Sequence, residues 1–370
     1  MNILFICYEF PPQIGGMETY ALELIKELSK KHQISVAIRK DYENIDYPEL
    51  SDVKIIPLLT YNLEDDVKRV LNLLENSNFD LIQINNAGFL VIANKIKNIS
   101  VVAKANGKDF LQSWLTNDRE AIRKGLNASN RIVVTSSFIN DRLVEMGINV
   151  DKIRIVPDGV DCNFFKPKNR KIALLNRLQI SKTSLIILSV GRVIDRKNFE
   201  AVIDVLPHLN DAYYLIVGPI IDKKYYEKIC KRIGDLGLGK RVKFLGQVSK
   251  KELLDFYNIC DVFVLLSKES ENESVEGFGI TLLEASSCAK PVIGSKKSGA
   301  AGAIVDDKTG YLVNPNNEKE LKSKLFKLIK NPELRIKLGK EGRKFVVKER
   351  TWKRCAGETE KIYFELCRNI

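Results

Sequence analysis

Residues 1–30 read MNILFICYEF PPQIGGMETY ALELIKELSK and show the unit from which most of the chain is built. The apolar run Asn2–Cys7 has the length and composition of a buried strand, and a loop with paired glycines follows it. From Glu18 to Lys31 the residues follow an amphipathic helical pattern. A strand, a glycine loop and a helix in this order predict a βα unit of a parallel sheet.

The same alternation continues through the first half of the chain. A second helix is predicted at Asp65–Asn76, between two of the apolar runs. Because strands and helices alternate, we expect one parallel sheet covered by helices on both faces. The further strands are predicted at Ile34–Ile38, Val53–Pro57, Leu81–Ile84, Val101–Ala105 and Arg131–Thr135.

The pattern starts again after a basic polar stretch near Phe164–Ile172 that contains Pro167. Since 370 residues are more than one core usually holds, we expect an α/β protein with two doubly wound, Rossmann-like domains facing a cleft. Strands are predicted at Leu185–Val190, Tyr213–Val217, Val242–Leu245, Val262–Leu266, Pro291–Ile293 and Tyr311–Val313, and helices at Asn198–Pro207, Tyr225–Leu236, Lys250–Asn258 and Ile280–Ser287.

Charge is distributed unevenly between the two halves. The net charge of +12 divides into −2 for residues 1–160 and +14 for the remainder. A basic second half suits an anionic ligand such as a nucleotide diphosphate, and would equally suit an anionic membrane surface or nucleic acid. No nucleic-acid-binding motif is present, so we expect no nucleic-acid partner. Solvated lysine-rich helix faces account for most of the excess.

Composition excludes several classes of site and location. The seven cysteines form no C-x-x-C pair and the two histidines stand apart, which disfavours a disulfide framework, a metal centre and a Ser-His-Asp triad. No run reaches the roughly 18 apolar residues of a spanning helix, and the apolar start is too short for a signal peptide. We therefore expect a cytoplasmic protein, with at most peripheral contact with the inner membrane face.

Three segments carry residues suited to binding a phosphorylated ligand. Gly15–Gly16 lies between a strand and a helix, where backbone N–H groups can approach a phosphate, although a plain tight turn explains the pair equally well. Arg192 follows a predicted strand and Lys197 begins the next helix, so the two cationic side chains can bind a diphosphate together. The alternative for Arg192 and Lys197 is a surface ion pair with Asp195.

The third segment, Val275–Ala285, is the most specific. Gly277 and Gly279 precede a predicted helix, whose free N–H groups face an anion site. Glu276 and Glu284 are eight positions apart, about two helical turns, so we expect them on roughly the same side. One carboxylate can accept hydrogen bonds from sugar hydroxyls and the other from a ribose diol. A helix cap explains Glu276 equally, but not Glu284 in its apolar setting.

Taken together, these segments resemble glycosyltransferase family 4, whose members have the GT-B fold. The resemblance covers nearly the whole chain and rests on the set of motifs rather than on any one of them. The matching segments are Pro11–Pro12 with Gly15–Glu18, Ile155–Asp161, Gly191–Arg192, Lys197–Asn198, Val217–Gly218, Phe244–Gly246, Glu276–Glu284, Lys290–Ile293, Ser298–Gly299, Thr309–Val313 and Trp352.

The resemblance implies a retaining, metal-independent hexosyltransferase of polysaccharide or glycolipid biosynthesis. It would need no cofactor, would use a UDP- or GDP-sugar as donor, and would act on a glycan or lipid-linked acceptor. Residues 1–165 would bind the acceptor, residues 166–350 would bind the nucleotide sugar, and a helix at about 351–370 would pack back on the first domain.

The resemblance also implies a role for each site residue. Arg192 and Lys197 would stabilise the leaving diphosphate, Glu276 would bind the donor sugar, and Glu284 the ribose. Gly15 and Gly16 would close the cleft from the first domain, and Val242–Gly246 with Gln247–Lys250 would border the base. The remaining donor-binding residues would be Asn106, Gly191, Phe244, Gly277, Phe278, Gly279 and Ile280.

Three positions depart from the family pattern. Asn106 stands where many members have His, Asp158 where Asn is usual, and Ala303 where an acidic residue is common. Asn106 can hydrogen-bond a sugar hydroxyl but cannot shuttle a proton at neutral pH. Asn106 and Ala303 motivate an alternative, a catalytically inactive partner subunit that binds a nucleotide sugar. A Rossmann oxidoreductase is disfavoured, because G-x-G-x-x-G does not follow the first strand.

The stretch Phe110–Leu126 is a candidate for contact with an anionic membrane. It combines Leu111, Trp114 and other apolar residues with several basic ones. The alternative is an ordinary helix packed on the first domain.

Overall fold

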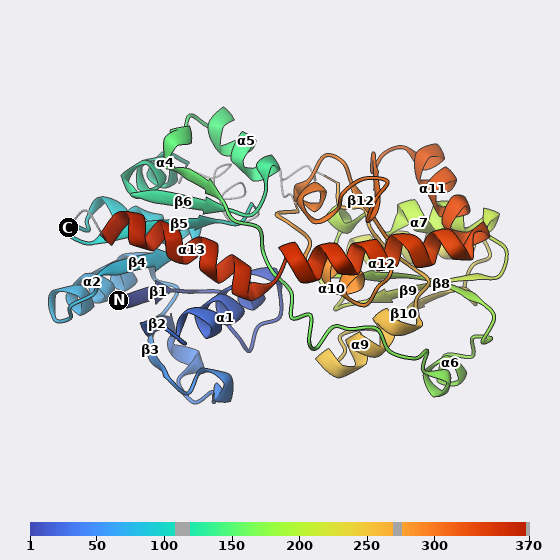
Figure 1. Ribbon diagram of the computed structural model, residues 1–370, viewed down its shortest axis with the longest axis horizontal. Helices are drawn as coiled ribbons and strands as arrows, with labels where there is room; N and C mark the ends of the chain where they lie inside the picture. Colours follow the sequence, from blue (N-terminus) through green and yellow to red (C-terminus); the bar gives the residue numbers. More distant parts are fainter. Residues whose placement is uncertain (108–118, 269–275, 368–370) are drawn as a thin grey trace. The chain divides into compact units, whose positions relative to one another are not determined.

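The computed structural model describes residues 1–107, 119–268 and 276–367 (Figure 1). The chain divides into two compact units. Unit 1 comprises Met1–Gly159, Asn272–Gly277 and Trp352–Ile370, and unit 2 comprises Val160–Glu271 and Phe278–Thr351. Among the described residues, no helix is both long enough and apolar enough to cross a membrane.

Unit 1 is built on a sheet of seven parallel strands in the order β3-β2-β1-β4-β5-β6-β7. On β1, Ile3 pairs with Ile34 on one side and with Leu81 on the other. Nearly all of β1 is buried, as expected for an inner strand of a sheet covered on both faces. The strands are β1 (Asn2–Ile6), β2 (Gln33–Arg39), β3 (Val53–Leu59), β4 (Leu81–Ile84), β5 (Ser100–Ala105), β6 (Arg131–Val134) and β7 (Ile153–Ile155).

Helices flank this sheet, and the last helix of the chain is one of them. The Tyr363 hydroxyl of α13 donates to the side-chain oxygen of Gln83 on β4, and both residues are buried. Glu360 accepts from Lys31 and contacts the His32 ring, each at 2.9 Å. In Figure 1, α13 runs beside α1. The described helices of unit 1 are α1 (Gly16–Leu28), α2 (Leu63–Glu75), α4 (Arg119–Ala128), α5 (Ser137–Glu145) and α13 (Trp352–Cys367).

A buried ion pair lies in the core of unit 1. Lys104 on β5 is fully buried, and its Nζ lies 3.4 Å from Asp158 Oδ1 and 3.9 Å from the centre of the Tyr20 ring. Burial raises the pKa of the Asp158 carboxyl, and the Lys104 charge opposes that rise. The family resemblance leads one to expect Asn at position 158. The buried Lys104 ammonium explains why an acidic residue stands there instead, because the two charges pair.

Unit 2 contains a six-stranded parallel sheet in the order β10-β9-β8-β11-β12-β13. On its strand β8 (Leu185–Val190), Ile186, Leu188 and Val190 pack into one apolar cluster and Ile187 into another, so both faces of the sheet are covered. The other strands are β9 (Ala212–Val217), β10 (Val242–Phe244), β11 (Val262–Leu265), β12 (Val292–Ser295) and β13 (Gly310–Val313).

The helices of unit 2 begin at well-defined caps. Ser249 and Glu252 form a reciprocal capping box at the start of α9, as their spacing of three residues allows. Asn331 caps α12 through the N–H of Leu334, and Pro332 occupies the first helical position. The described helices are α6 (Ile172–Arg177), α7 (Glu200–Val205), α8 (Lys223–Asp235), α9 (Lys250–Ile259), α10 (Ile280–Ser287), α11 (Glu318–Lys330) and α12 (Pro332–Glu349).

The predicted fold class is confirmed by two parallel α/β sheets with doubly wound strand orders. Three elements have the bounds expected from the sequence, namely Leu81–Ile84, Leu185–Val190 and Ile280–Ser287. β7 was not predicted, because it has only three residues at the edge of the sheet and its Ile155 is 47% exposed. A short, half-exposed strand lacks the apolar run that identifies an inner strand.

Replacing Asp158 with Asn tests the buried pair. Asp158→Asn leaves the Lys104 ammonium buried without its carboxylate, so we expect a loss of about 3–5 kcal/mol in the free energy of unfolding of unit 1. Urea unfolding followed by tryptophan fluorescence measures this loss. The double variant Lys104→Met/Asp158→Asn should recover most of it.

The matched control is Lys54→Met, which removes an exposed lysine from β3 and should change stability by less than about 0.5 kcal/mol. Equal stability of Asp158→Asn and the natural protein would contradict the assignment of a buried charge pair.

Candidate functional site

Two of the predicted cations come together at the carboxyl end of β8. Gly191 and Arg192 follow this strand directly, and the Gly191 N–H donates to Val217 O at 2.9 Å. The Lys197 side chain folds back toward the same point. A Cβ on Gly191 would lie 3.1 Å from Lys197 Cε and 3.5 Å from its Nζ. The structure therefore places the Lys197 ammonium beside the residue that precedes Arg192.

Arg192 is half-buried and forms no hydrogen bond or ion pair with any residue that the structure describes. The alternative of an ion pair with Asp195 is wrong for Arg192, because Asp195 pairs instead with Lys268, at 3.2 Å. In parallel α/β sheets, ligands bind outside the carboxyl ends of the strands. A guanidinium held there without an acidic partner is suited to a bound anion, especially phosphate.

The short turn that carries Lys197, η5 (Asp195–Lys197), is fixed from two sides. Lys268, which follows β11, contacts Asp195 Oδ1 at 3.2 Å and Glu200 Oε1 at 3.0 Å. Its N–H also donates to Arg196 O at 2.9 Å. Asn198 has a left-handed backbone and donates its amide to Pro315 O at 3.0 Å. Sequence reasoning missed Lys268, because no motif marks a lysine at that position.

Helix α10 begins at Ile280, as the sequence predicts. Gly279 is its N-cap, with φ of 87°, a conformation that suits glycine, so Glu276 lies outside the helix. That Glu276 and Glu284 lie on roughly the same side stays a prediction. The helix start has no side-chain cap, and the Phe278 and Ile280 side chains are buried. Phe278 and Ile280 can reach a ligand only through their backbone.

Glu284 lies in α10 and is 9% exposed. Its Oε2 accepts a hydrogen bond of 2.6 Å from the hydroxyl of Tyr257 on α9. Burial raises the pKa of Glu284 to about 7, although the Tyr257 hydrogen bond and the Lys250 charge oppose the shift. Glu284 therefore exchanges a proton near neutral pH, and only its ionised form presents two accepting oxygens. Sequence reasoning missed Tyr257, because it resembles a core residue of its helix.

The aromatic residue at the end of β10 also has a defined setting. The Phe244 ring packs edge-on against Tyr226 of α8, with ring centres 5.0 Å apart. Beside it, the Gly218 N–H donates to Gly246 O at 2.8 Å, joining the segments that follow β9 and β10. That Phe244 borders a nucleotide base remains a prediction.

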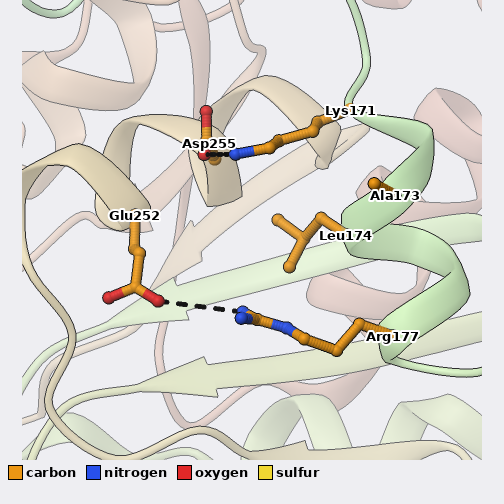
Figure 2. A pocket seen from close by; sticks show the side chains of 6 residues that line it. All are labelled: Lys171, Ala173, Leu174, Arg177, Glu252 and Asp255. Carbon is orange, nitrogen blue, oxygen red and sulfur yellow. Dashed lines mark hydrogen bonds and ion pairs between the residues drawn. The ribbon is translucent and has the colours of Figure 1, made fainter.

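A separate hollow of about 220 Å³ lies between α6 and α9, away from these residues (Figure 2). Ion pairs connect the two helices across it, Lys171 with Asp255 at 2.5 Å and Arg177 with Glu252 at 3.8 Å. Figure 2 shows these side chains pointing at one another across the hollow. Their charges are matched, so the hollow offers no uncompensated charge to a ligand.

The predicted residues of unit 1 lie at its own strand ends. Gly15 is the N-cap of α1, and a Cβ there would collide with the Glu18 carboxylate. A phosphate approaching this helix start would therefore meet a protein carboxylate. The Asn106 amide, just after β5, donates to Asn85 O at 3.3 Å.

The structure brings Gly277 to the Asn106 backbone within unit 1. The Gly277 carbonyl accepts from Thr135 Oγ1 at 2.9 Å and from Ser136 Oγ at 3.1 Å. A Cβ on Gly277 would collide with Asn106 O. Its neighbour Glu276 is half-buried and groups with unit 1 as well, whereas Phe278 to Glu284 group with unit 2.

The candidate membrane stretch is described only in its second half. Leu111 and Trp114 lie outside the described residues. On α4, Ile122 and Leu126 are fully buried in the unit 1 core, and Arg123 pairs with Glu120 at 2.9 Å. These two apolar side chains are therefore not available to lipid, in keeping with the alternative of an ordinary packed helix.

Two solved structures share the fold over the whole chain. A sucrose-phosphate synthase from Thermosynechococcus elongatus has a TM-score of 0.84 and 21% identity, covering 100% of both chains. HepE from Anabaena, in complex with UDP and glucose, has a TM-score of 0.83 and 19% identity, covering 99% of this chain and 100% of that one. At these identities the likeness shows the fold, which is GT-B.

Sequence comparison identifies the family. The GDP-mannose-dependent alpha-(1-6)-phosphatidylinositol monomannoside mannosyltransferase of Mycolicibacterium smegmatis is 24% identical over 366 residues, covering 95% of each chain. The model of Glycosyltransferase Family 4 matches residues 14–164, and that of Glycosyl transferases group 1 matches residues 171–345. With both of its halves matched in order, and with the GT-B fold, the chain belongs to glycosyltransferase family 4.

Proposed function

We propose that the protein transfers a hexosyl unit from a UDP- or GDP-sugar to a hydroxyl of a glycan or lipid-linked acceptor, with retention of anomeric configuration and without a metal ion. The observation that carries this proposal is the pairing of two cations at the end of β8. Arg192 has no acidic partner among the described residues, and the Lys197 ammonium lies beside Gly191. A diphosphate supplies the negative charge that Arg192 lacks among these residues.

The comparisons support a nucleotide sugar as donor. The Mycolicibacterium relative uses GDP-mannose, and the Anabaena structure holds UDP and glucose. The acceptor of the Mycolicibacterium enzyme is a phosphatidylinositol mannoside, which supports a lipid-linked acceptor and, with it, peripheral contact with an anionic membrane. Neither relative decides between guanine and uracil for this chain.

Each residue of the site has a role in this reaction. Negative charge develops on the diphosphate as the glycosidic bond breaks, and fixed cations stabilise it without having to reorganise. Arg192 and Lys197 supply those cations. Glu284 accepts hydrogen bonds from the ribose diol, Glu276 binds the donor sugar, and the N–H groups that open α10 bind the phosphate or sugar. The departing phosphate takes the acceptor proton, so no separate protein base is needed.

A panel of nucleotide sugars tests the function directly. We expect UDP-glucose or GDP-mannose, rather than ADP-glucose, to raise the melting temperature, because a ligand that binds only the folded state stabilises it. The same donor should then be turned over with lipid-linked or oligosaccharide acceptors. Stabilisation by a donor without hydrolysis or transfer would favour the inactive partner subunit, and no stabilisation by any donor would contradict the proposal.

Truncating either cation should slow transfer more than it weakens donor binding. For Lys197→Ala and Arg192→Ala we expect kcat to fall about 100- to 1,000-fold, because each cation acts mainly on charge that develops in the transition state. Arg192→Lys keeps the charge but loses the planar fork, and should lie between these variants and the natural protein.

The matched control is Lys223→Ala, which removes an exposed lysine at the start of α8 in the same unit. Its kcat should stay within about twofold. Unchanged kcat in both Lys197→Ala and Arg192→Ala would contradict the assignment of the diphosphate site.

Donor affinity should rise with pH through the Glu284 titration. Because the pKa of Glu284 is about 7, the carboxylate that accepts from the ribose is mostly protonated at pH 6 and mostly ionised at pH 8. We expect up to about tenfold tighter binding of a nucleotide sugar at pH 8 than at pH 6. Calorimetric titration measures this, since the diphosphate stays ionised over that range.

Two variants test whether Glu284 is the group that titrates. Glu284→Gln should bind more weakly at pH 8 and show a flat pH profile. Tyr257→Phe removes a hydrogen bond that lowers the pKa of Glu284, so its midpoint should move to higher pH. An unaltered profile in Glu284→Gln would assign the titration to another group.

A further inference from the structure

Three neighbouring strands of unit 1 place aromatic and basic side chains at one edge of the sheet. Tyr8 lies two residues beyond β1, Arg39 is the last residue of β2, and Tyr61 lies two residues beyond β3. These strands are adjacent in the order β3-β2-β1 and run parallel, so their carboxyl ends meet. We call Tyr8, Arg39 and Tyr61 the aromatic platform.

The platform rings lie in a stacked arrangement. The Tyr8 and Tyr61 ring centres are 6.0 Å apart, and the ring planes differ by 23°. The Arg39 guanidinium lies 4.2 Å from the Tyr61 ring centre and 4.5 Å from that of Tyr42. Tyr61 nevertheless stays 65% exposed, and among the described residues it is the one tyrosine that counts as an exposed large apolar side chain. The Tyr61 ring is thus held in place while most of its surface stays exposed.

Tyr61 also adopts an unfavourable backbone conformation. Its φ is 68°, in the left-handed region that bulky residues rarely occupy. The preceding residue fixes it there, because the Thr60 N–H donates to both oxygens of Asp66 at 2.9 Å. The Tyr8 hydroxyl donates to the same carboxylate. The left-handed conformation of Tyr61 costs backbone free energy, and its exposed ring buries little apolar area that could offset this cost. Such a residue suggests a role in binding.

The charges around the platform select a neutral ligand. Arg39 donates to the Asp41 carboxylate and to the Tyr42 hydroxyl, so its charge is already compensated. The first turn of α2, just after Tyr61, adds the exposed acidic residues Glu64 and Asp65. Lys68 pairs with Glu64 at 3.2 Å, so of these two acidic residues it is Asp65 that has no ion pair among the described residues. A phosphate would be repelled by that carboxylate, whereas a hydroxyl of a neutral ring could donate to it.

We propose that the aromatic platform binds the polyhydroxylated ring of the acceptor, a sugar or an inositol ring, through stacking of its C–H face on Tyr61. This inference rests on the proposed function, since it assigns the acceptor subsite of the same reaction. Such a ring has an apolar face that suits a tyrosine ring and a polar rim that suits the neighbouring carboxylates. Sugar and inositol share this chemistry, and the experiment distinguishes them.

The test variant is Tyr61→Gly, because glycine adopts a φ of 68° without strain. The melting temperature of this variant should therefore be unchanged or higher. The matched control is Asn98→Gly, at another exposed residue of unit 1 with a φ of 65°. Both variants relieve the same backbone conformation, and only one removes an aromatic ring.

Saturation-transfer NMR on the full chain measures ring binding without turnover. The probes are methyl α-D-mannopyranoside, methyl α-D-glucopyranoside and myo-inositol, each used separately. We expect transfer to the ring protons of at least one probe in the natural protein and in Asn98→Gly, with a loss of about fivefold or more in Tyr61→Gly. The probe that gives transfer identifies the ring class.

Two results would overturn the platform: transfer to none of the three probes in the natural protein, or equal transfer in Tyr61→Gly. Donor turnover is measured on the same preparations, and Tyr61→Gly should keep its donor affinity. Ring binding that depends on Tyr61 in a protein without donor turnover would refute the proposed function and leave the platform standing. Donor turnover with ring binding that is independent of Tyr61 would refute the platform alone.

Discussion

The parallel direction of the strands is the constraint on which both candidate sites depend. In a parallel sheet every strand ends at the same edge, so strand direction alone brings residues that are far apart in sequence close together there. In unit 2 this edge collects Arg192 after β8, the helix start at Gly279 and the aromatic Phe244 at the end of β10. In unit 1 it collects Tyr8, Arg39 and Tyr61 from three neighbouring strands.

The two edges differ in their chemistry, and that difference matches the two substrates of a glycosyl transfer. The edge of unit 2 presents the Arg192 guanidinium, which has no acidic partner among the described residues. It also presents the Lys197 ammonium beside Gly191 and a helix start without a side-chain cap. These groups suit an anion. The edge of unit 1 presents an exposed aromatic ring and a guanidinium already compensated by a carboxylate. Those groups suit a neutral, polyhydroxylated ring.

Sequence reasoning reached the fold and the cations because both leave local signals. Apolar runs of strand length alternate with helical patterns, and Arg192 and Lys197 stand next to a strand in a known motif. It failed where the signal is purely spatial. Tyr257 looks like a core residue until its hydroxyl is seen to donate to Glu284, and Lys268 has no motif at all. The left-handed conformation of Tyr61 depends on tertiary contacts that periodicity cannot encode.

The most direct measurement of the central claim is a crystal structure of the protein with GDP or UDP. The account predicts diphosphate oxygens within about 3 Å of the Arg192 guanidinium and the Lys197 ammonium, with the ribose diol at the Glu284 carboxylate. A nucleotide bound with its diphosphate elsewhere, and with both cations left in solvent, would contradict it.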